Sequence, residues 1–301
     1  MSDSAFETSD IAFETEDGFP LRGTLLSGSG RGPAVLISSA AAVPDGFYRH
    51  FAGRLIEQGA SRVLSYDYRG VARSVTPRRW KARLNMKDWG VLDMPAALDT
   101  LKRHAKGTSV VGIGHSFGGV ALGLSNRSQD FQRYVTLASL SGYYRNTAEP
   151  LTVFARMNLL GVPLTLPFGR LPKWSGIGEA LPGTVFRDWA RWCRNPTFLF
   201  EDPKVPEARY FPAVRTPVLG IGITDDPWGT PRAVDLFLAR LSNARISQLW
   251  LSPEKPLAEP IGHLGFFRKQ RAQTLWPPVI DWLLHDRMPE AATPRRQAQA
   301  A

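Results

Sequence analysis

The pentapeptide Gly114-His115-Ser116-Phe117-Gly118 contains the residue best suited to act as a nucleophile. It joins a short β-branched run, 110–113, to the apolar and helix-like stretch 120–124. A Gly-x-Ser-x-Gly sequence between a strand and a helix is typical of a nucleophile elbow, a strained turn that directs the serine hydroxyl outward. We therefore predict Ser116 as the nucleophile and the amide of Phe117 as a donor to an oxyanion. The alternative is a glycine-rich turn that only packs, with Ser116 as an N-cap.

A serine hydroxyl is too weakly acidic to attack unaided, so a nearby base is required. His263 lies in the loop 260–265, after the last predicted strand and between two glycines. That is where the base of a Ser–acid–His triad is expected. The other four histidines are expected in helices, near the chain end or turned aside by the elbow: His50, His104, His115 and His285. We predict His263 as the base, against the alternative of an exposed loop histidine.

Two adjacent acids, Asp225 and Asp226, close a predicted strand between Ser116 and His263. The third member of a triad holds the imidazole in one tautomer and stabilises its protonated form. Either acid fits that role. The following Pro227 favours Asp226, whereas counting three residues on from Gly222 favours Asp225. We prefer Asp226, and expect the remaining acid to cap the next segment or accept a hydrogen bond from a backbone amide.

A second oxyanion donor is expected in the loop Ser39-Ala40-Ala41-Ala42, which follows the apolar strand 34–37. We select the amide of Ala41. One such donor typically changes the rate by about 10² to 10³. In the alternative interpretation, the small residues only let the chain pass tightly from strand to helix.

Strand and helix patterns alternate along most of the chain, which predicts a parallel sheet with right-handed crossovers. We expect an α/β fold with a mostly parallel, eight-stranded sheet flanked by helices. Residues 1–142 and 213–290 would form this core, and 1–10 and 287–301 would be flexible tails. The alternation breaks over 143–212, where prolines separate short helical pieces rich in aromatic residues. This insertion is expected to be a helical cap, most of whose rings pack and some of which line a pocket.

Composition narrows the class of protein. The 301 residues carry a formal net charge of +10 and a single cysteine, Cys193, which excludes an internal disulfide framework. No pattern suggests a metal site or a nucleic-acid-binding module. The acidic start does not resemble a signal peptide, and no run comes near the ~20 apolar residues that span a bilayer, so we expect a cytoplasmic protein without a membrane span.

Seven basic residues between Arg69 and Lys87, with no acid until Asp88, are expected to lie over the carboxyl edge of the sheet. This basic segment would either attract an anionic substrate or form a solvated loop.

Motifs spread from about residue 10 to 286 carry a family resemblance. They are Val43-Pro44 with Phe47-Tyr48-Arg49, Tyr66-Asp67-Tyr68-Arg69-Gly70, Asp88-Trp89, 114–119, Leu181-Pro182-Gly183 with Trp189-Ala190-Arg191-Trp192-Cys193, Thr224-Asp225-Asp226, 262–268 and Leu275-Trp276-Pro277. The chain resembles the α/β-hydrolases, in particular the bacterial serine aminopeptidase-like branch with its uncharacterised predicted hydrolases. It departs from that pattern at Ala40-Ala41-Ala42, where relatives tend to carry bulkier residues and a glycine.

The resemblance implies a triad of Ser116, His263 and one acid of the pair, a cap over the pocket, and no cofactor. We expect a serine hydrolase acting on a small acyl substrate through an acyl-enzyme. A carboxylic ester is preferred, with a thioester or small amide as alternatives. Acyl transfer and aminopeptidase activity are further alternatives, and the latter needs a carboxylate to bind the substrate amine. The nearest acids in the cap are Glu179, Asp188, Glu201 and Asp202. A catalytically silent binding protein of the same fold is the alternative outside enzymes.

Overall fold

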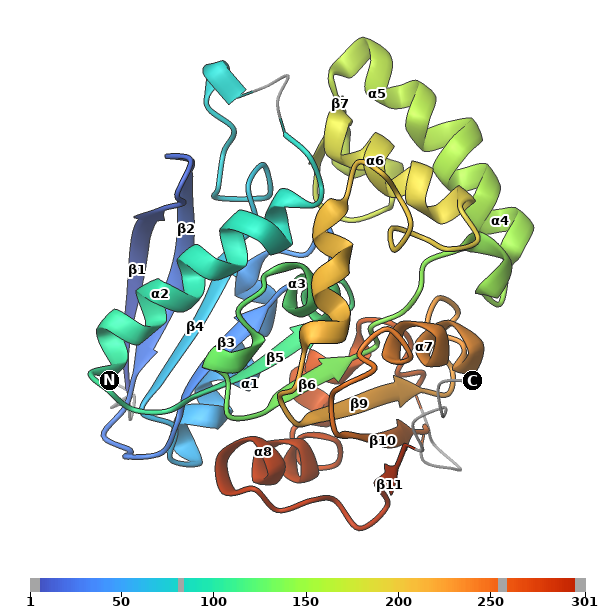
Figure 1. The fold of residues 1–301 in the computed structure, drawn as a ribbon. Coiled ribbons are helices and arrows are strands. Elements are labelled where there is room, and N and C mark those ends of the chain that lie inside the picture. Colours follow the sequence, from blue (N-terminus) through green and yellow to red (C-terminus); the bar gives the residue numbers. More distant parts are fainter. Residues whose placement is uncertain (1–5, 81–83, 254–258, 296–301) are drawn as a thin grey trace.

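The computed structural model describes residues 6–80, 84–253 and 259–295, which are organised around one nine-stranded sheet (Figure 1). The strands in sheet order are β1 (Glu7–Glu14), β2 (Pro20–Ser27), β4 (Arg62–Asp67), β3 (Ala34–Ser38), β5 (Val110–His115), β6 (Tyr134–Leu137), β9 (Val218–Ile223), β10 (Ile246–Leu251) and β11 (Thr293–Pro294). The six strands from β4 to β10 are mutually parallel. The β1–β2, β2–β4 and β10–β11 pairs are antiparallel. The predicted α/β fold with a mostly parallel sheet is confirmed.

Helices cover both faces of the sheet because its central strands are apolar on both sides. In β3, Leu36 belongs to one buried cluster while Val35 and Ile37 belong to the other. The first cluster is covered by α2 (Met94–Ala105), α3 (Phe117–Leu124) and α7 (Pro231–Leu238). The second is covered by α1 (Arg49–Glu57) and α8 (Trp276–His285).

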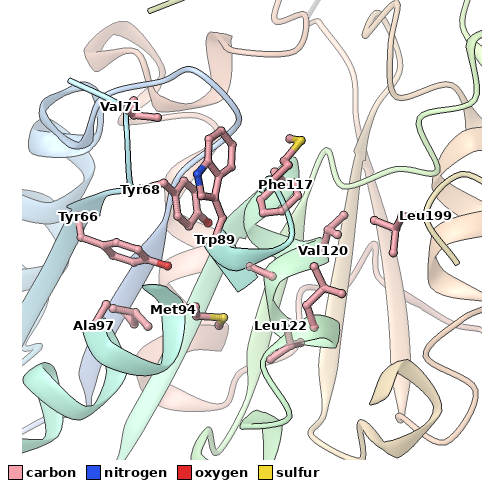
Figure 2. Close-up of a cluster of buried hydrophobic side chains, with 14 of the residues drawn as sticks. Tyr66, Tyr68, Val71, Trp89, Met94, Ala97, Phe117, Val120, Leu122 and Leu199 are labelled. Atoms are coloured by element: carbon pink, nitrogen blue, oxygen red, sulfur yellow. The ribbon is translucent and has the colours of Figure 1, made fainter. Parts of the chain in front are cut away.

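Aromatic packing supports the start of α3. The ring of Trp89 stacks on Tyr68 at 4.8 Å between centroids and meets Phe117 edge-on at 5.3 Å. Figure 2 shows these rings close together beside the first turn of the helix. All three side chains are at most 4% exposed, so close packing of these rings holds the start of α3 and the turn before it in place.

The expectation for both chain ends needs correction. Residues 7–10, predicted to be a flexible tail, belong to β1, because Glu7 to Glu14 pair along their whole length with β2. At the other end, β11 lies within the predicted tail 287–301 and adds a ninth strand beside β10. β1 forms a hairpin with the next strand along the chain and begins earlier than its apolar residues indicate. β11 depends on backbone pairing with the distant β10, which side-chain patterns in a polar sequence do not reveal. Residues 1–5 and 296–301 lie outside the described residues.

The insertion between β6 and β9 forms a layer above the carboxyl ends of the strands (Figure 1). Its helices are α4 (Pro150–Phe154), a π-helical segment (Ala155–Gly161), α5 (Val162–Phe168) and α6 (Gly183–Arg194), with the small β7 (Arg170–Leu171) and β8 (Leu181–Pro182) pair. The first three run on as one helix of 19 residues, Pro150–Phe168, which by length and composition alone could cross a membrane. From the sequence we expected no run long and apolar enough to span a membrane, and this helix departs from that expectation.

Three residues of the basic segment, Arg69, Arg73 and Lys87, form ion pairs with acids of the same chain. Arg69 is 1% exposed, and its Nε donates to Asp93 at 2.6 Å while its Nη1 lies 2.9 Å from Asp17. Arg73 similarly contacts Asp45 at 2.6 Å. Arg69 and Arg73 therefore brace the loop after β4, and the expectation of a solvated or substrate-attracting segment does not apply to them. Lys81 and Arg83 lie outside the described residues.

Candidate active site

Ser116 occupies the tip of a sharp turn between β5 and α3. Its backbone has φ 51° and ψ −110°, a strained conformation for any residue with a Cβ. The Ser116 amide attaches this turn to β6 by donating to Leu137 O at 2.8 Å. A Cβ at Gly114 would lie 2.3 Å from the backbone of Gly118, and one at Gly118 would lie 2.2 Å from Ser38 O. Both glycines are required for this close approach, and the serine side chain borders an open pocket.

His263 and Asp226 form a close pair beside that pocket. Nδ1 of His263 lies 2.7 Å from Oδ2 of Asp226, and the other carboxylate oxygen accepts from the Trp228 amide at 2.8 Å. Burial alone would raise the pKa of Asp226. The charge and hydrogen bond of His263, with the nearby amides, outweigh burial and hold that pKa below its usual value. The carboxylate is thus kept ionised next to the imidazole.

Asp225 has a different position, although it is adjacent in sequence. Its two carboxylate oxygens accept hydrogen bonds from the amides of Ile261 at 2.9 Å and Gly262 at 3.0 Å. Gly262 has φ 55°, so the His263 loop turns through a conformation that favours glycine. Asp225 therefore ties down the loop that carries the imidazole, while Asp226 contacts the imidazole itself.

His115, which the sequence analysis expected to point aside, supports the same loop from below. Its side chain is fully buried, with Nδ1 3.0 Å from the hydroxyl of Tyr48 and Nε2 2.8 Å from the carbonyl oxygen of His263. The Tyr48 hydroxyl accepts from the Ala40 amide at 2.9 Å, so its own proton is directed to His115 Nδ1. Nε2 then carries the proton donated to His263. A histidine at the variable elbow position was the only sequence signal for this link.

The predicted oxyanion donors, Phe117 and Ala41, both line the pocket that contains Ser116. Within the described chain, neither amide donates a hydrogen bond to another protein group. Phe117 begins α3, so its N–H is one of the free amides at a helix start. Ala42 has φ 60°, a left-handed conformation that favours glycine, and it lies in the stretch 40–42 where the chain departs from the related pattern. The cap reaches this loop, because the Glu179 amide donates to Ala42 O at 2.8 Å.

The pocket has a volume of about 220 Å³ and lies between the core and the cap. Ser116 and His263 both border it, together with mostly apolar side chains. Those from the core are Val43, Met86, Val120, Leu140, Trp228 and Leu264, and those from the cap are Met157, Ile177, Trp189 and Phe198. Arg156 is the one Lys, Arg, Asp or Glu among its lining residues in the described part of the chain. Other cap rings pack inward, with Phe186 and Trp192 at most 1% exposed.

The four acids considered for binding an amine do not border the pocket. Asp188 and Asp202 pair with Arg191, and Glu179 pairs with Lys173 at 2.5 Å. Burial raises the pKa of the Cys193 thiol to about 12, so Cys193 is a packed residue and not a reactive thiolate. Over residues 6–80, 84–253 and 259–295, no group of three His, Cys, Asp or Glu side chains could hold a metal ion.

Each site residue lies in the loop directly after one of the parallel strands. Ala41 follows β3, Ser116 follows β5, Asp225 and Asp226 follow β9, and His263 follows β10. The carboxyl ends of parallel strands meet at one edge, so residues nearly 150 positions apart become neighbours.

The fold resembles several solved structures, esterases among them. An esterase of Pyrococcus furiosus superposes with a TM-score of 0.60 at 18% identity, covering 90% of this chain and 89% of that one. An esterase from Exiguobacterium antarcticum gives 0.58 at 14% identity, covering 91% and 99%. Est1E from Butyrivibrio proteoclasticus, solved with ferulic acid bound, gives 0.59 at 16% identity, covering 90% and 97%.

No curated protein matches the sequence. At these identities the structural likeness establishes the fold alone, and it does not distinguish the serine aminopeptidase-like branch, which stays a prediction. The model of the alpha/beta hydrolase family matches residues 26–295, nearly the whole chain and every site residue described above. On that match, the protein is a member of the alpha/beta hydrolase family.

Proposed function

We propose that this hydrolase cleaves a carboxylic ester through an acyl-enzyme on Ser116. One observation carries the proposal: His263, paired through Nδ1 with buried Asp226 at 2.7 Å, borders the same pocket as the strained Ser116. A serine, an imidazole and a carboxylate in this arrangement have the roles of nucleophile, base and orienting acid.

In the proposed reaction, Ser116 Oγ attacks the ester carbonyl carbon while its proton passes to Nε2 of His263. The negative charge that forms on the carbonyl oxygen accepts hydrogen bonds from the amides of Phe117 and Ala41. The C–O bond to the leaving group then breaks, and the alcohol departs with the proton from His263. Water attacks the acyl-serine by the reverse proton path and releases the acid. A thioester or small amide would pass through the same steps.

The pocket favours a substrate with an apolar acyl group. Its lining is mainly aliphatic and aromatic, and its volume of about 220 Å³ suits a short chain or a single ring. Arg156 at its border would favour a substrate that also carries a negative charge. No carboxylate borders the pocket among the described residues, so nothing specific supports an aminopeptidase.

The test compares Ser116→Ala with Ser252→Ala, a matched change at an exposed serine outside the pocket. We expect Ser116→Ala to abolish turnover of short p-nitrophenyl esters and labelling by a fluorophosphonate probe. Ser252→Ala should retain both. Peptide mapping of the labelled wild type should locate the adduct at Ser116. Labelling of Ser116→Ala at the wild-type rate would exclude this nucleophile, and tight ester binding with no adduct would favour the binding-protein alternative.

A further inference from the structure

The long cap helix, Pro150–Phe168, turns an apolar face outward. Leu151 is 82% exposed, and Leu159 and Leu166 are each 70% exposed. The inward face is formed by residues four apart, Val153, Met157, Gly161 and Thr165, all of which are buried. A surface helix of a globular protein normally shows the opposite arrangement, with polar residues outside.

This face continues past the end of the helix. Phe168 is 56% exposed and Trp174 is 68% exposed, and their rings meet edge-on at 6.3 Å between centroids. Within the described chain, six of the ten exposed large apolar side chains lie between Leu151 and Trp174. We refer to these six as the cap patch: Leu151, Leu159, Leu160, Leu166, Phe168 and Trp174. Clustering of this kind marks an interaction surface, since scattered single residues are the usual pattern.

The charges around the cap patch identify the kind of partner. Residues 150–178 contain three basic residues and no acid, and Glu149 and Glu179 flank them. Lys173 pairs with Glu179, whereas no acid forms an ion pair with Arg156 or Arg170 among the described residues. The whole chain has a formal net charge of +10, so two copies repel each other overall, whereas a negatively charged surface attracts the chain. An apolar face with basic residues and an aromatic pair at its edge matches the boundary of an anionic bilayer, where acyl chains meet negatively charged headgroups.

The helix is held on the protein in a way that excludes crossing the bilayer. A Cβ at Gly161 would lie 2.5 Å from the ring of Phe186, so the helix is in close contact with α6. Met157, on the same buried side, lines the pocket. Removing the helix from this position would open the pocket and expose its apolar wall. The outward face can therefore enter the lipid interface only while the helix lies parallel to it.

We propose that the cap patch binds the surface of an anionic lipid bilayer, with the helix Pro150–Phe168 lying in the plane of the interface. The leucines lie on the outward face of this helix, and Met157 on its buried face lines the pocket of the candidate active site. The pocket is thereby brought next to lipid. Surface binding does not depend on the identity of the nucleophile.

The test measures flotation of the full chain with vesicles of phosphatidylcholine containing 30% phosphatidylglycerol, and with pure phosphatidylcholine as the neutral comparison. We expect binding to the anionic vesicles that weakens at high salt, and at least about tenfold weaker binding to the neutral ones. Leu159→Gln with Leu166→Gln should reduce binding to anionic vesicles by at least about tenfold. Both positions are exposed and glutamine is a good helix former, so the variant should keep its Tm and its activity on a soluble short-chain ester.

The matched control is Leu236→Gln with Met288→Gln, which removes two exposed apolar side chains outside the cap patch and should leave flotation unchanged. Arg170→Gln with Lys173→Gln should reduce the preference for anionic vesicles. The proposal is overturned if the wild type does not float with anionic vesicles or if the Leu159/Leu166 variant floats equally well. A wild-type dimer that this variant converts to a monomer would assign the cap patch to self-association instead. Retention in the vesicles after carbonate extraction would exclude the in-plane arrangement.

Discussion

His115 should make the folded protein sensitive to acid, and the effect can be isolated with the variant His115→Gln. Burial lowers the pKa of His115 to about 3 from its ordinary 6.5, and the neighbouring His263 adds to this effect. The unfolded chain takes up a proton below pH 6.5, whereas the folded protein does not until about pH 3. The stability contributed by neutral His115 is therefore complete above pH 6.5 and is lost as the pH falls.

The size of the effect follows from the two pKa values. Between pH 7.5 and pH 5.0, His115 alone should reduce the free energy of unfolding by about 2 kcal/mol, since each pKa unit corresponds to ~1.4 kcal/mol. Glutamine does not titrate, so His115→Gln should lack this part of the pH dependence even if its stability at pH 7.5 is lower. Other titrating groups are common to both proteins and cancel in the difference.

Urea unfolding followed by circular dichroism at both pH values provides the measurement. The wild type should lose about 2 kcal/mol more than His115→Gln between pH 7.5 and 5.0. His104→Gln, at an exposed position on α2, is the matched control and should behave as the wild type. If the wild type and His115→Gln lose the same free energy, then His115 is not held neutral by its buried site, and the proton arrangement assigned to Tyr48 and His263 is wrong.

Three further changes test the roles assigned to the acids. Asp226→Asn should lower kcat for a p-nitrophenyl ester by about 10³ to 10⁴, because the imidazole loses the carboxylate that orients it and stabilises its protonated form. Asp225→Ala should lower kcat by a smaller factor of about 10 to 100 and should also lower Tm, because two charge-assisted hydrogen bonds to the His263 loop are lost. An unchanged Tm would contradict this role of Asp225. Arg69→Met should reduce the free energy of unfolding in urea by about 3 to 5 kcal/mol, since Asp93 is then buried without its partner. A loss below about 1 kcal/mol would show that Asp93 takes up a proton at little cost.

Local patterns were sufficient for much of the fold and for part of the candidate site. The alternation of apolar runs and amphipathic stretches predicted the parallel sheet. A strand buried on both faces consists almost entirely of apolar residues, and this makes it recognisable in the sequence. The spacing of Gly114, Ser116 and Gly118 identified the turn, since only glycine tolerates a backbone approach of 2.3 Å or less. The order of Ser116, the acid pair and His263 indicated the chemistry because chain order reflects the strands that carry each residue.

Other features depended on contacts between distant segments. Asp225 and Asp226 follow the same strand and have the same chemistry, and only the path of the 260–265 loop decides which carboxylate meets Nδ1 of His263 and which meets the loop amides. β11 carries a weak pattern of its own and exists because the edge of β10 offers free backbone groups, and the polar start of β1, residues 7–10, pairs with β2 for the same reason.

What the sequence by itself determined was therefore most of the helices and strands of the core, their order and the types of side chain at the sheet edge. The tertiary structure alone decided that His115 lies under the carbonyl of His263, that Arg69 is buried between acids, and that a cap helix keeps its leucines outside. The physical reason is that local propensity depends on near neighbours, whereas burial and hydrogen-bond partners depend on segments that only folding brings together.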